Sequence, residues 1–182
     1  MEVRYEDILL RDMKESDIED YVRWFTKETE WGDWDAPWEG HFESDEESER
    51  KGWTEYFESV KELLEDVTRW KFEIESNGVH IGWVSFYTDL EWMENKEEIP
   101  AIGIDIPEET YRKNGVGTKA LKSFMEYLKE RGYKTIYTQT WSGNYPMLRV
   151  AEKLGFKEIA RKKDYREVNG KKYDALTFRV DF

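Results

Sequence analysis

The most informative stretch of the chain runs from Ile104 to Thr118 and reads I-D-I-P-E-E-T-Y-R-K-N-G-V-G-T. Its alternating apolar residues stop at Pro107, which indicates the end of a strand. An R-x-x-G-x-G loop begins at Arg112, and a helical pattern follows directly. A strand, a glycine-rich loop and a helix in this order direct backbone N–H groups at the helix start toward one point. The segment is therefore a candidate anion-binding loop.

This loop differs from two familiar phosphate loops. It lacks the Gly-Lys-[Ser/Thr] ending of a Walker A loop, and it lacks the third glycine of a dinucleotide-binding loop. A plain glycine-rich connection between strand and helix is the alternative interpretation. The residues expected to hold the anion, through backbone N–H groups and basic side chains, are Arg112, Lys113, Asn114, Gly115, Val116, Gly117 and Thr118.

Working outward from the loop, the sequence predicts alternating helices and strands on its C-terminal side. They are a helix over 117–131, a strand over 135–140, a helix over 144–154 and a hairpin formed by 156–168 and 171–180. On the N-terminal side the patterns predict a strand over 8–13, a helix opened by a Ser16/Glu19 capping box, a loop over 31–38, a helix opened by a Ser44/Glu47 capping box, a hairpin around Asn77-Gly78 and a strand over 99–106.

These elements predict one mixed α/β domain over residues 1–182. The strands are joined by hairpins with helices inserted at intervals, unlike the strict alternation of a doubly wound sheet. A length of 182 residues and an aromatic content of 16% agree with a single folded core.

The composition excludes several kinds of chemistry. The chain has no cysteine, which excludes disulfides, a thiolate nucleophile and cysteine-ligated metals. It has two histidines, His41 and His80, to which we assign no role, and we expect no metal. The apolar runs are too short to cross a membrane and the N-terminus is charged, so we expect a cytoplasmic protein.

Charge is distributed unevenly along the chain. Residues 1–100 contain 30 acidic and 11 basic side chains, a net charge of −19, whereas residues 101–182 carry +6. An acidic surface repels nucleic acids and anionic membranes and attracts cations. We therefore expect neither nucleic acid nor membrane as a partner, and favour a cationic ligand for the first half.

The sequence resembles the GNAT superfamily of acyl-CoA-dependent N-acetyltransferases. Arg112, Gly115 and Gly117 satisfy the family motif [QR]-x-x-G-x-[GA]. A second family feature, an Asn after a strand followed by E-K-L-G-F, is present at Asn144 and at 152–156. The G-I-D segment ending at Asp105 looks like the branch that holds ribosomal-protein N-terminal and aminoglycoside 6′-N-acetyltransferases.

The resemblance implies a mostly antiparallel sheet that splays into a V, with helices on both faces. Acetyl-CoA would lie between the strands at 99–106 and 135–140, with its pyrophosphate on 113–118 and its pantetheine along Ile104 to Ile106. Asn144 would hydrogen-bond the cofactor arm, although its position also suits a helix N-cap. Residues 99–182 would then form the CoA-binding half and 1–98 the acceptor side.

Amine acetylation requires a base that takes a proton from the acceptor. Asp105 is the first candidate, because it lies on the cofactor strand with Ile104 and Ile106 facing the other way. A structural ion pair or turn cap before Pro107 is the alternative. Glu98 and Glu91 are weaker candidates.

Two positions depart from the family pattern. Many relatives have a Tyr as general acid where this chain has Ala151, and many have a carboxylate where this chain has Ala101. The proton for the leaving thiolate would then come from Ser142, Tyr145 or water.

The acceptor site is expected between the first two helices. There Trp31, Asp33, Trp34 and Asp35 combine aromatic rings with carboxylates, which suits an ammonium. Packing of the tryptophans against the early helices is the alternative.

We therefore predict an acetyl-CoA-dependent N-acetyltransferase that acetylates a primary amine of a small cationic molecule or peptide by direct attack in a ternary complex. The candidate acceptors are an aminoglycoside-like antibiotic, a polyamine or a basic peptide N-terminus, and the protein would be a monomer or a homodimer. The alternative is a catalytically silent acyl-CoA-binding or sensor protein on the same fold.

Overall fold

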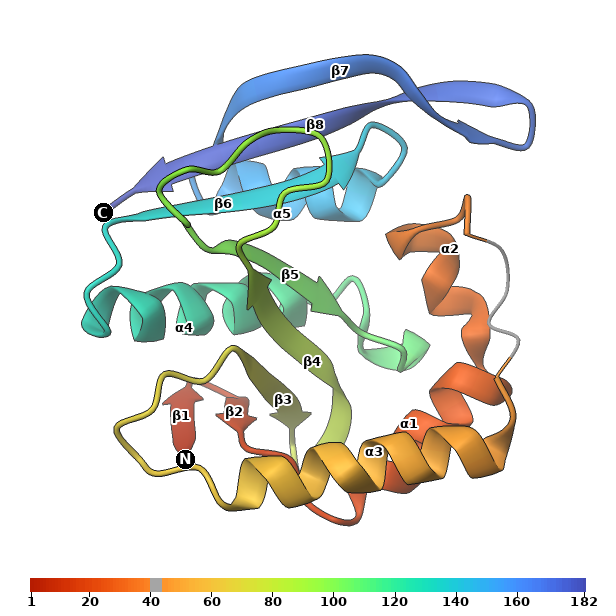
Figure 1. Ribbon diagram of the computed structural model, residues 1–182, viewed down its shortest axis with the longest axis vertical. Helices are drawn as coiled ribbons and strands as arrows, with labels where there is room; N and C mark the ends of the chain where they lie inside the picture. Colours follow the sequence, from red (N-terminus) through yellow and green to blue (C-terminus); the bar gives the residue numbers. More distant parts are fainter. Residues whose placement is uncertain (40–43) are drawn as a thin grey trace.

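A computed structural model describes residues 1–39 and 44–182 (Figure 1); His41 lies outside the described residues. The described strands form one sheet in the order β1-β2-β3-β4-β5-β6-β8-β7. They are β1 (Glu2–Tyr5), β2 (Ile8–Arg11), β3 (Lys71–Ser76), β4 (Val79–Tyr87), β5 (Ala101–Asp105), β6 (Thr135–Trp141), β7 (Lys157–Val168) and β8 (Lys171–Asp181). The helices are α1 (Asp17–Thr26), α2 (Gly32–Asp35), α3 (Glu46–Lys61), α4 (Val116–Glu130) and α5 (Tyr145–Lys153). Short 3-10 turns occur at Thr29–Trp31 and Glu109–Tyr111. The predicted single mixed α/β domain is confirmed.

Helices cover both faces of the sheet, because strand residues alternate between two apolar clusters. Val84 belongs to the main core, which α4 and α5 close from one side. Its neighbour Trp83 points the opposite way, into an aromatic cluster formed with α1 and α3. The largest fully buried side chains of the main core are Phe72, Phe124, Ile8, Leu10, Ile74, Ile81, Ile102, Leu121, Leu128 and Ile136.

The sheet opens between its two parallel strands. β5 and β6 are paired only at Ala101 and Tyr137, while the other neighbouring strands pair antiparallel along their length. One more contact, from the Thr138 hydroxyl to the Ile102 carbonyl at 2.8 Å, lies just beyond that pair. β5 then stays with β4 as far as Asp105, and β6 stays with β8 as far as Trp141. The facing edges of β5 and β6 therefore diverge, which produces the expected V (Figure 1).

Several local predictions differ from the structure. β1 was not predicted, because four residues at a sheet edge carry too little pattern to identify a strand. The predicted loop over 31–38 instead contains the helical turn α2, whose four residues G-D-W-D are too few to show a helical period. No described helix is long and apolar enough to span a membrane.

Both predicted capping boxes are wrong. Ser16 has helical backbone angles and its side chain makes no cap bond; the adjacent Asp17 accepts from Lys14 N at 2.7 Å instead. The N-cap of α3 is Asp45 rather than Ser44, because its carboxylate accepts from the backbone N–H groups of Glu47 and Ser48 at 3.0 Å each. A carboxylate caps a helix at least as well as a serine.

Gly82 determines how closely β4 approaches the end of β5. Its φ is +154°, and a Cβ at this position would lie 2.0 Å from the Asp105 carbonyl oxygen. Asp105 thus has its place in the sheet only because residue 82 has no side chain.

We expect Gly82→Ala to lower the free energy of unfolding by about 3 kcal/mol or more, because backbone cannot move aside as a flexible side chain can. Gly52→Ala is the matched control: Gly52 is exposed within α3 and an added Cβ meets nothing within 4 Å. That change should stabilise the protein by about 0.5–1 kcal/mol through helix propensity. Urea unfolding of both variants measures the difference, and equal stabilities would contradict the close approach.

Candidate functional site

The candidate anion-binding loop, residues 112–118, connects β5 to the start of α4. Gly115 is the N-cap of α4 and adopts the left-handed conformation with φ +80°. Lys113 is also left-handed, with φ +69°, and is exposed. The first N–H groups of a helix have no acceptor within the helix, and the first turn of α4 contains no acidic residue. The helix start is therefore open to an anion.

Arg112 has a structural task in this loop. Its guanidinium donates to the carbonyls of Ile106 and Pro107 at 2.7 Å each and pairs with Glu30 at 2.5 Å. These contacts fasten the loop to the end of β5. The positive charge that the sequence analysis assigned to anion binding is thus partly balanced by Glu30.

The strand and the loop are joined by close packing. A Cβ on Gly117 would contact the Cδ1 atoms of Ile106 at 3.5 Å and Ile104 at 3.7 Å. Both isoleucine side chains therefore face α4, and Asp105 between them points to the opposite face. The alternation expected for these three residues is present, and the backbone of β5 borders the V.

Asn144 connects the far wall of the V to α2. Its side-chain oxygen accepts from Met147 N at 3.1 Å, so it caps α5. Its amide nitrogen donates to the Trp34 carbonyl at 2.8 Å, and the Trp141 indole donates to the same carbonyl at 2.9 Å. Both hydrogen-bonding ends of Asn144 are therefore engaged within the protein.

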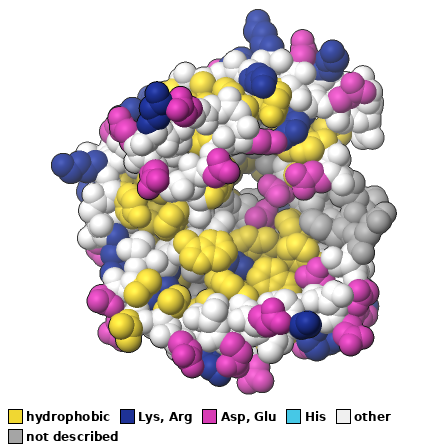
Figure 2. Space-filling view, viewed as in Figure 1, with side chains coloured by type: hydrophobic (Ala, Val, Ile, Leu, Met, Phe, Trp, Pro, Cys, Tyr) yellow, Lys and Arg dark blue, Asp and Glu magenta, His cyan; other side chains and the backbone are white. Residues whose placement is uncertain are grey.

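Asp105 is half-buried on the face of β5 that is turned away from α4, and we call the space on this side of the V the cleft. Asp35 is a further acidic group near Asp105, and Glu39 is one near Asp35. Burial, and then the nearby Asp35, raise the pKa of Asp105 well above its ordinary value, while Lys71 acts to lower it. Surrounding protein and Glu39 also raise the pKa of Asp35, although its side chain remains exposed. Burial and Asp35 raise the pKa of Tyr87 at the end of β4. Figure 2 shows the hollow on this side, with an apolar floor and acidic side chains around it.

The other expected acceptor residues occupy different environments. Trp31 is only 5% exposed, donates to the Trp24 carbonyl at 3.0 Å and packs edge-on against Trp83. It supports the cleft from behind instead of facing it. Asp33 and Trp34 are exposed on α2, and the Trp34 indole donates to Glu30.

Ser142 is not close to Asp105. Its hydroxyl accepts from Asp174 N at 3.0 Å, and it lines a depression with Leu148 of α5 and Phe178 of β8. This is the face covered by α4 and α5, whereas Asp105 points to the other face. Tyr145 is exposed at the start of α5, and Ala151 is buried in the core. Glu91 and Glu98 are exposed in the loop before β5.

A buried charged network behind the cleft was missed by the sequence analysis. His80, to which no role was assigned, contacts Asp20 through Nδ1 at 3.0 Å and Glu73 through Nε2 at 3.1 Å. Burial opposes its charge, but these carboxylates raise the pKa of His80 to about 9. The available signal was the alternation K-F-E-I-E over 71–75, whose charged residues share one face of β3.

Asp17, Asp20 and His80 come close enough to hold a metal, with ligand atoms within 4.8 Å of one another. Each already has a protein cation or carboxylate as partner: Arg11 binds both oxygens of Asp17 at 2.6 and 2.9 Å, and Arg23 pairs with Asp20 at 2.9 Å. The group is an ion-pair network of the fold.

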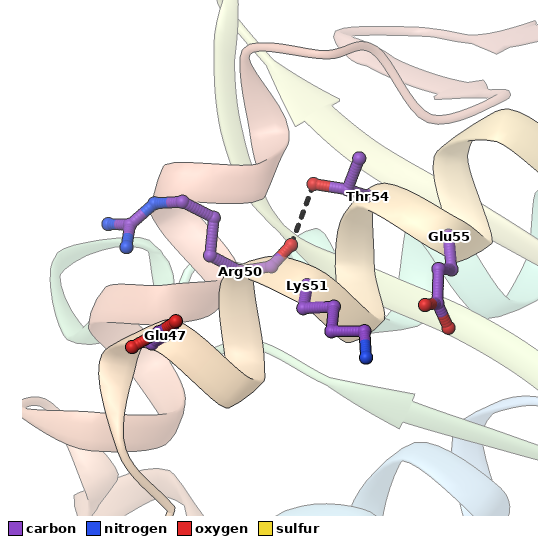
Figure 3. A pocket seen from close by; sticks show the side chains of 5 residues that line it. All are labelled: Glu47, Arg50, Lys51, Thr54 and Glu55. Carbon is purple, nitrogen blue, oxygen red and sulfur yellow. Dashed lines mark hydrogen bonds between the residues drawn. The ribbon is translucent and has the colours of Figure 1, made fainter.

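A shallow depression lies on α3, away from the V (Figure 3). All the side chains lining it come from this one helix, and the Thr54 hydroxyl donates to the Arg50 carbonyl at 2.7 Å. Side chains from a single helix face do not converge on a ligand as those of a binding site do. The V remains the candidate site.

Comparison with known proteins agrees with this geometry. Residues 7–157 match the family described as the acetyltransferase (GNAT) domain. The chain belongs to this family. The family indicated by the Arg112 loop is therefore confirmed.

Individual relatives are more distant. An uncharacterised N-acetyltransferase of Methanocaldococcus jannaschii is 28% identical over 113 residues, which are 60% of this chain and 47% of that protein. The chain thus spans about half the length of this curated relative. A ribosomal L7/L12 alpha-N-protein acetyltransferase, solved in complex with coenzyme A, has a TM-score of 0.76 at 17% identity and covers 100% of this chain and 98% of that one. A ribosomal-protein-S5-alanine acetyltransferase of Vibrio fischeri has a TM-score of 0.74 at 19% identity, covering 100% and 96%. At these low identities, the two solved structures show that the GNAT protein shares their fold.

We expect His80 to titrate near pH 9 rather than at its ordinary 6.5, which the ring-proton NMR signal measures directly. A raised folded-state pKa stabilises the protein fully below pH 6.5, and this stability is lost as pH rises through 9. Relative to His80→Gln, the wild type should lose up to about 3 kcal/mol of unfolding free energy over that window. A His80 signal that titrates at or below 6.5 would contradict the assignment of its partners.

Proposed function

We propose that this GNAT protein transfers the acetyl group of acetyl-CoA to a primary amine of a cationic acceptor, by direct attack in a ternary complex. The single observation that supports this most is the anion-binding loop at the mouth of the V, with Asp105 on the wall beside it. One element order therefore brings a candidate phosphate-binding loop and a carboxyl group with a raised pKa to the same opening.

The loop suits the pyrophosphate of acetyl-CoA. Left-handed Gly115 turns the backbone N–H groups outward, and exposed Lys113 adds a positive charge. The pantetheine arm would pair with the β5 edge at Ile104 and Ile106. The side-chain amide nitrogen of Asn144 would have to leave the Trp34 carbonyl before it could donate a hydrogen bond to the pantetheine arm. When bound, acetyl-CoA supplies an activated thioester.

Asp105 takes the proton from the acceptor ammonium in this proposal. A general base works best when its pKa lies near the working pH, and burial together with Asp35 moves the pKa of Asp105 upward from the usual range of carboxyl groups. Ser142 stays a predicted proton donor to the leaving thiolate: its oxygen accepts from Asp174 N, which leaves its own proton free to donate. Water is the alternative donor.

The acceptor would approach over α2. Asp33 and Asp35 offer negative charge and Trp34 an exposed ring, whereas buried Trp31 acts by supporting the wall. The named structural relatives act on ribosomal proteins, so peptides with the N-termini of ribosomal proteins join polyamines and aminoglycosides as acceptors to test. The cytoplasmic location and a monomeric or dimeric state remain predictions.

A silent acyl-CoA-binding protein is the second candidate, favoured by Ala151, which is buried where relatives carry a tyrosine acid. The two functions differ in turnover. Because the chain has no cysteine, a thiol reagent reports released CoA with no background from the protein. Thiol release with one class of amine supports the transferase, whereas acetyl-CoA binding without release from any amine supports the silent binder.

We expect Asp105→Asn to lower kcat by at least about 100-fold near neutral pH, because the amide cannot accept the proton. Acetyl-CoA affinity, measured by calorimetry, should stay within about twofold, since the substitution preserves the shape of the side chain. Glu126→Gln, which removes an exposed carboxylate from α4, is the control for net charge and should behave as wild type. Unchanged turnover in Asp105→Asn would exclude this residue as the base.

We expect Gly115→Glu to abolish acetyl-CoA binding, because it places a carboxylate where the phosphates bind and strains a left-handed position. Gly170→Glu is the matched control: Gly170 has φ +75° in the β7–β8 turn, and an added Cβ also meets nothing within 4 Å. The control carries the same strain and charge away from the loop and should bind normally. Equal affinities of the two variants would show that the loop does not bind the cofactor.

A further inference from the structure

One buried cation on the α1 and α3 face of the sheet has no role in the function proposed above. Lys71, on β3, is 7% exposed, and its ammonium nitrogen lies over four aromatic rings. The distances from Nζ to the ring centroids are 4.3 Å for Tyr21, 4.4 Å for Trp53, 5.0 Å for Tyr56 and 5.1 Å for Trp83. We call these four rings the Lys71 cage. A cage of this kind binds a cation by its ring faces, and here the chain supplies its own.

The register of the sheet places the Lys71 cage beside Asp105. Trp83, one wall of the cage, is paired with Asp105 across β4 and β5, so the two side chains are neighbours on one face. Along the next row, Lys71 is paired with Ser85 and Ser85 with Gly103. A Cβ added at Gly103 would meet nothing within 4 Å. The row that leads from Lys71 to β5 therefore contains only small residues.

Several charged groups face Lys71. Glu73 on the same strand lies 3.7 Å from Nζ, and Asp105 on β5 and Asp17 on α1 also favour the ammonium. Tyr21 of α1 and Tyr56 of α3 contribute the ring faces. Burial acts in the opposite direction and lowers the pKa of Lys71.

The carboxylates of Glu73 and Asp105 differ in how far their charge is already balanced. Glu73 also accepts from the Tyr21 hydroxyl at 2.5 Å and contacts His80 at 3.1 Å. Asp105 has Asp35 as its negative neighbour and Lys71 as its positive one. Without the Lys71 charge, Glu73 would still have Tyr21 and His80 as partners, whereas Asp105 would keep only its hydrogen bond from the neutral Trp83 indole.

We propose that Lys71 is a positioning residue for acetyl transfer: a built-in counter-ion, held in its aromatic cage, that keeps Asp105 in the ionised, proton-accepting form while Asp35 lies nearby. The kinetic effect of Lys71 rests on the proposed function, in which Asp105 is the base. The effect of Lys71 on the charge of Asp105 does not depend on that function. It also assigns the cage to the protein's own cation, which leaves Asp33, Trp34 and Asp35 on α2 as the groups that meet the acceptor ammonium.

The kinetic experiment compares Lys71→Met with Lys71→Arg. Methionine keeps the length and apolar character of the stem but removes the charge, whereas arginine keeps the charge. In Lys71→Met the acidic limb of the kcat/KM profile should move to higher pH. The rate at pH 7 should fall about tenfold, which corresponds to one pKa unit, and recover at pH 9. Lys71→Arg should retain the wild-type limb. Lys51→Met, which removes an exposed lysine from α3, is the control for net charge.

The pH profile separates this role from a structural one. A variant that is merely damaged loses the same factor at every pH and regains nothing at pH 9, and that result would overturn the proposal. An unmoved acidic limb in Lys71→Met would overturn it as well.

Two NMR measurements need no turnover and therefore remain decisive if no amine is acetylated. The first follows the side-chain nitrogen of Lys71 in the wild-type protein, assigned with Lys71→Arg, and does not depend on any variant that fails to fold. A charged ammonium at pH 7 supports the proposal and a neutral amine overturns it. The second follows the carboxyl carbon of Asp105, assigned with Asp105→Asn. Its titration should move up by about one pH unit in Lys71→Met, and an unshifted titration would overturn the proposal.

Discussion

The separation of two parallel strands is the constraint on which the rest of this structure depends. β5 and β6 share one paired position, Ala101 with Tyr137, and then diverge while each keeps its antiparallel partner on the other side. Strand edges that face each other without pairing carry unsatisfied N–H and C=O groups, which water or a ligand must satisfy. The sheet thereby offers an extended backbone surface to an elongated substrate, and α4 begins at the mouth of the same opening.

The two faces of the sheet are stabilised in different ways. The face under α4 and α5 is a conventional apolar core, with Phe72, Ile102 and Phe124 fully buried. The face under α1 and α3 buries charges, and buried charges are stable only when paired. Arg11 with Asp17, His80 with Glu73, and Lys71 within its ring cage meet that requirement. This face consequently holds a network of paired charges behind the cleft.

This environment changes the basicity of Asp105. A carboxyl group at a solvent-exposed strand end would have an ordinary pKa and be a weak base. Here burial and Asp35 raise its pKa and Lys71 opposes the rise, so the balance among three groups on three elements sets its basicity. The same face includes Gly82, whose missing side chain allows Asp105 to lie where these influences meet.

The sequence by itself determined the parts that depend on neighbouring residues. The strand-loop-helix order around Arg112 and Gly115, the capping of α5 by Asn144 and the alternation of Ile104, Asp105 and Ile106 follow from local chemistry, and they were predictable for that reason. Tertiary structure alone decided which side chains share the cleft. Lys71, Trp83 and Asp105 lie on three different strands and meet through strand register. Trp31 turned into the core and Ser142 toward α5, because the packing of α1, α3 and α5 against the sheet determines those directions and no short pattern encodes it.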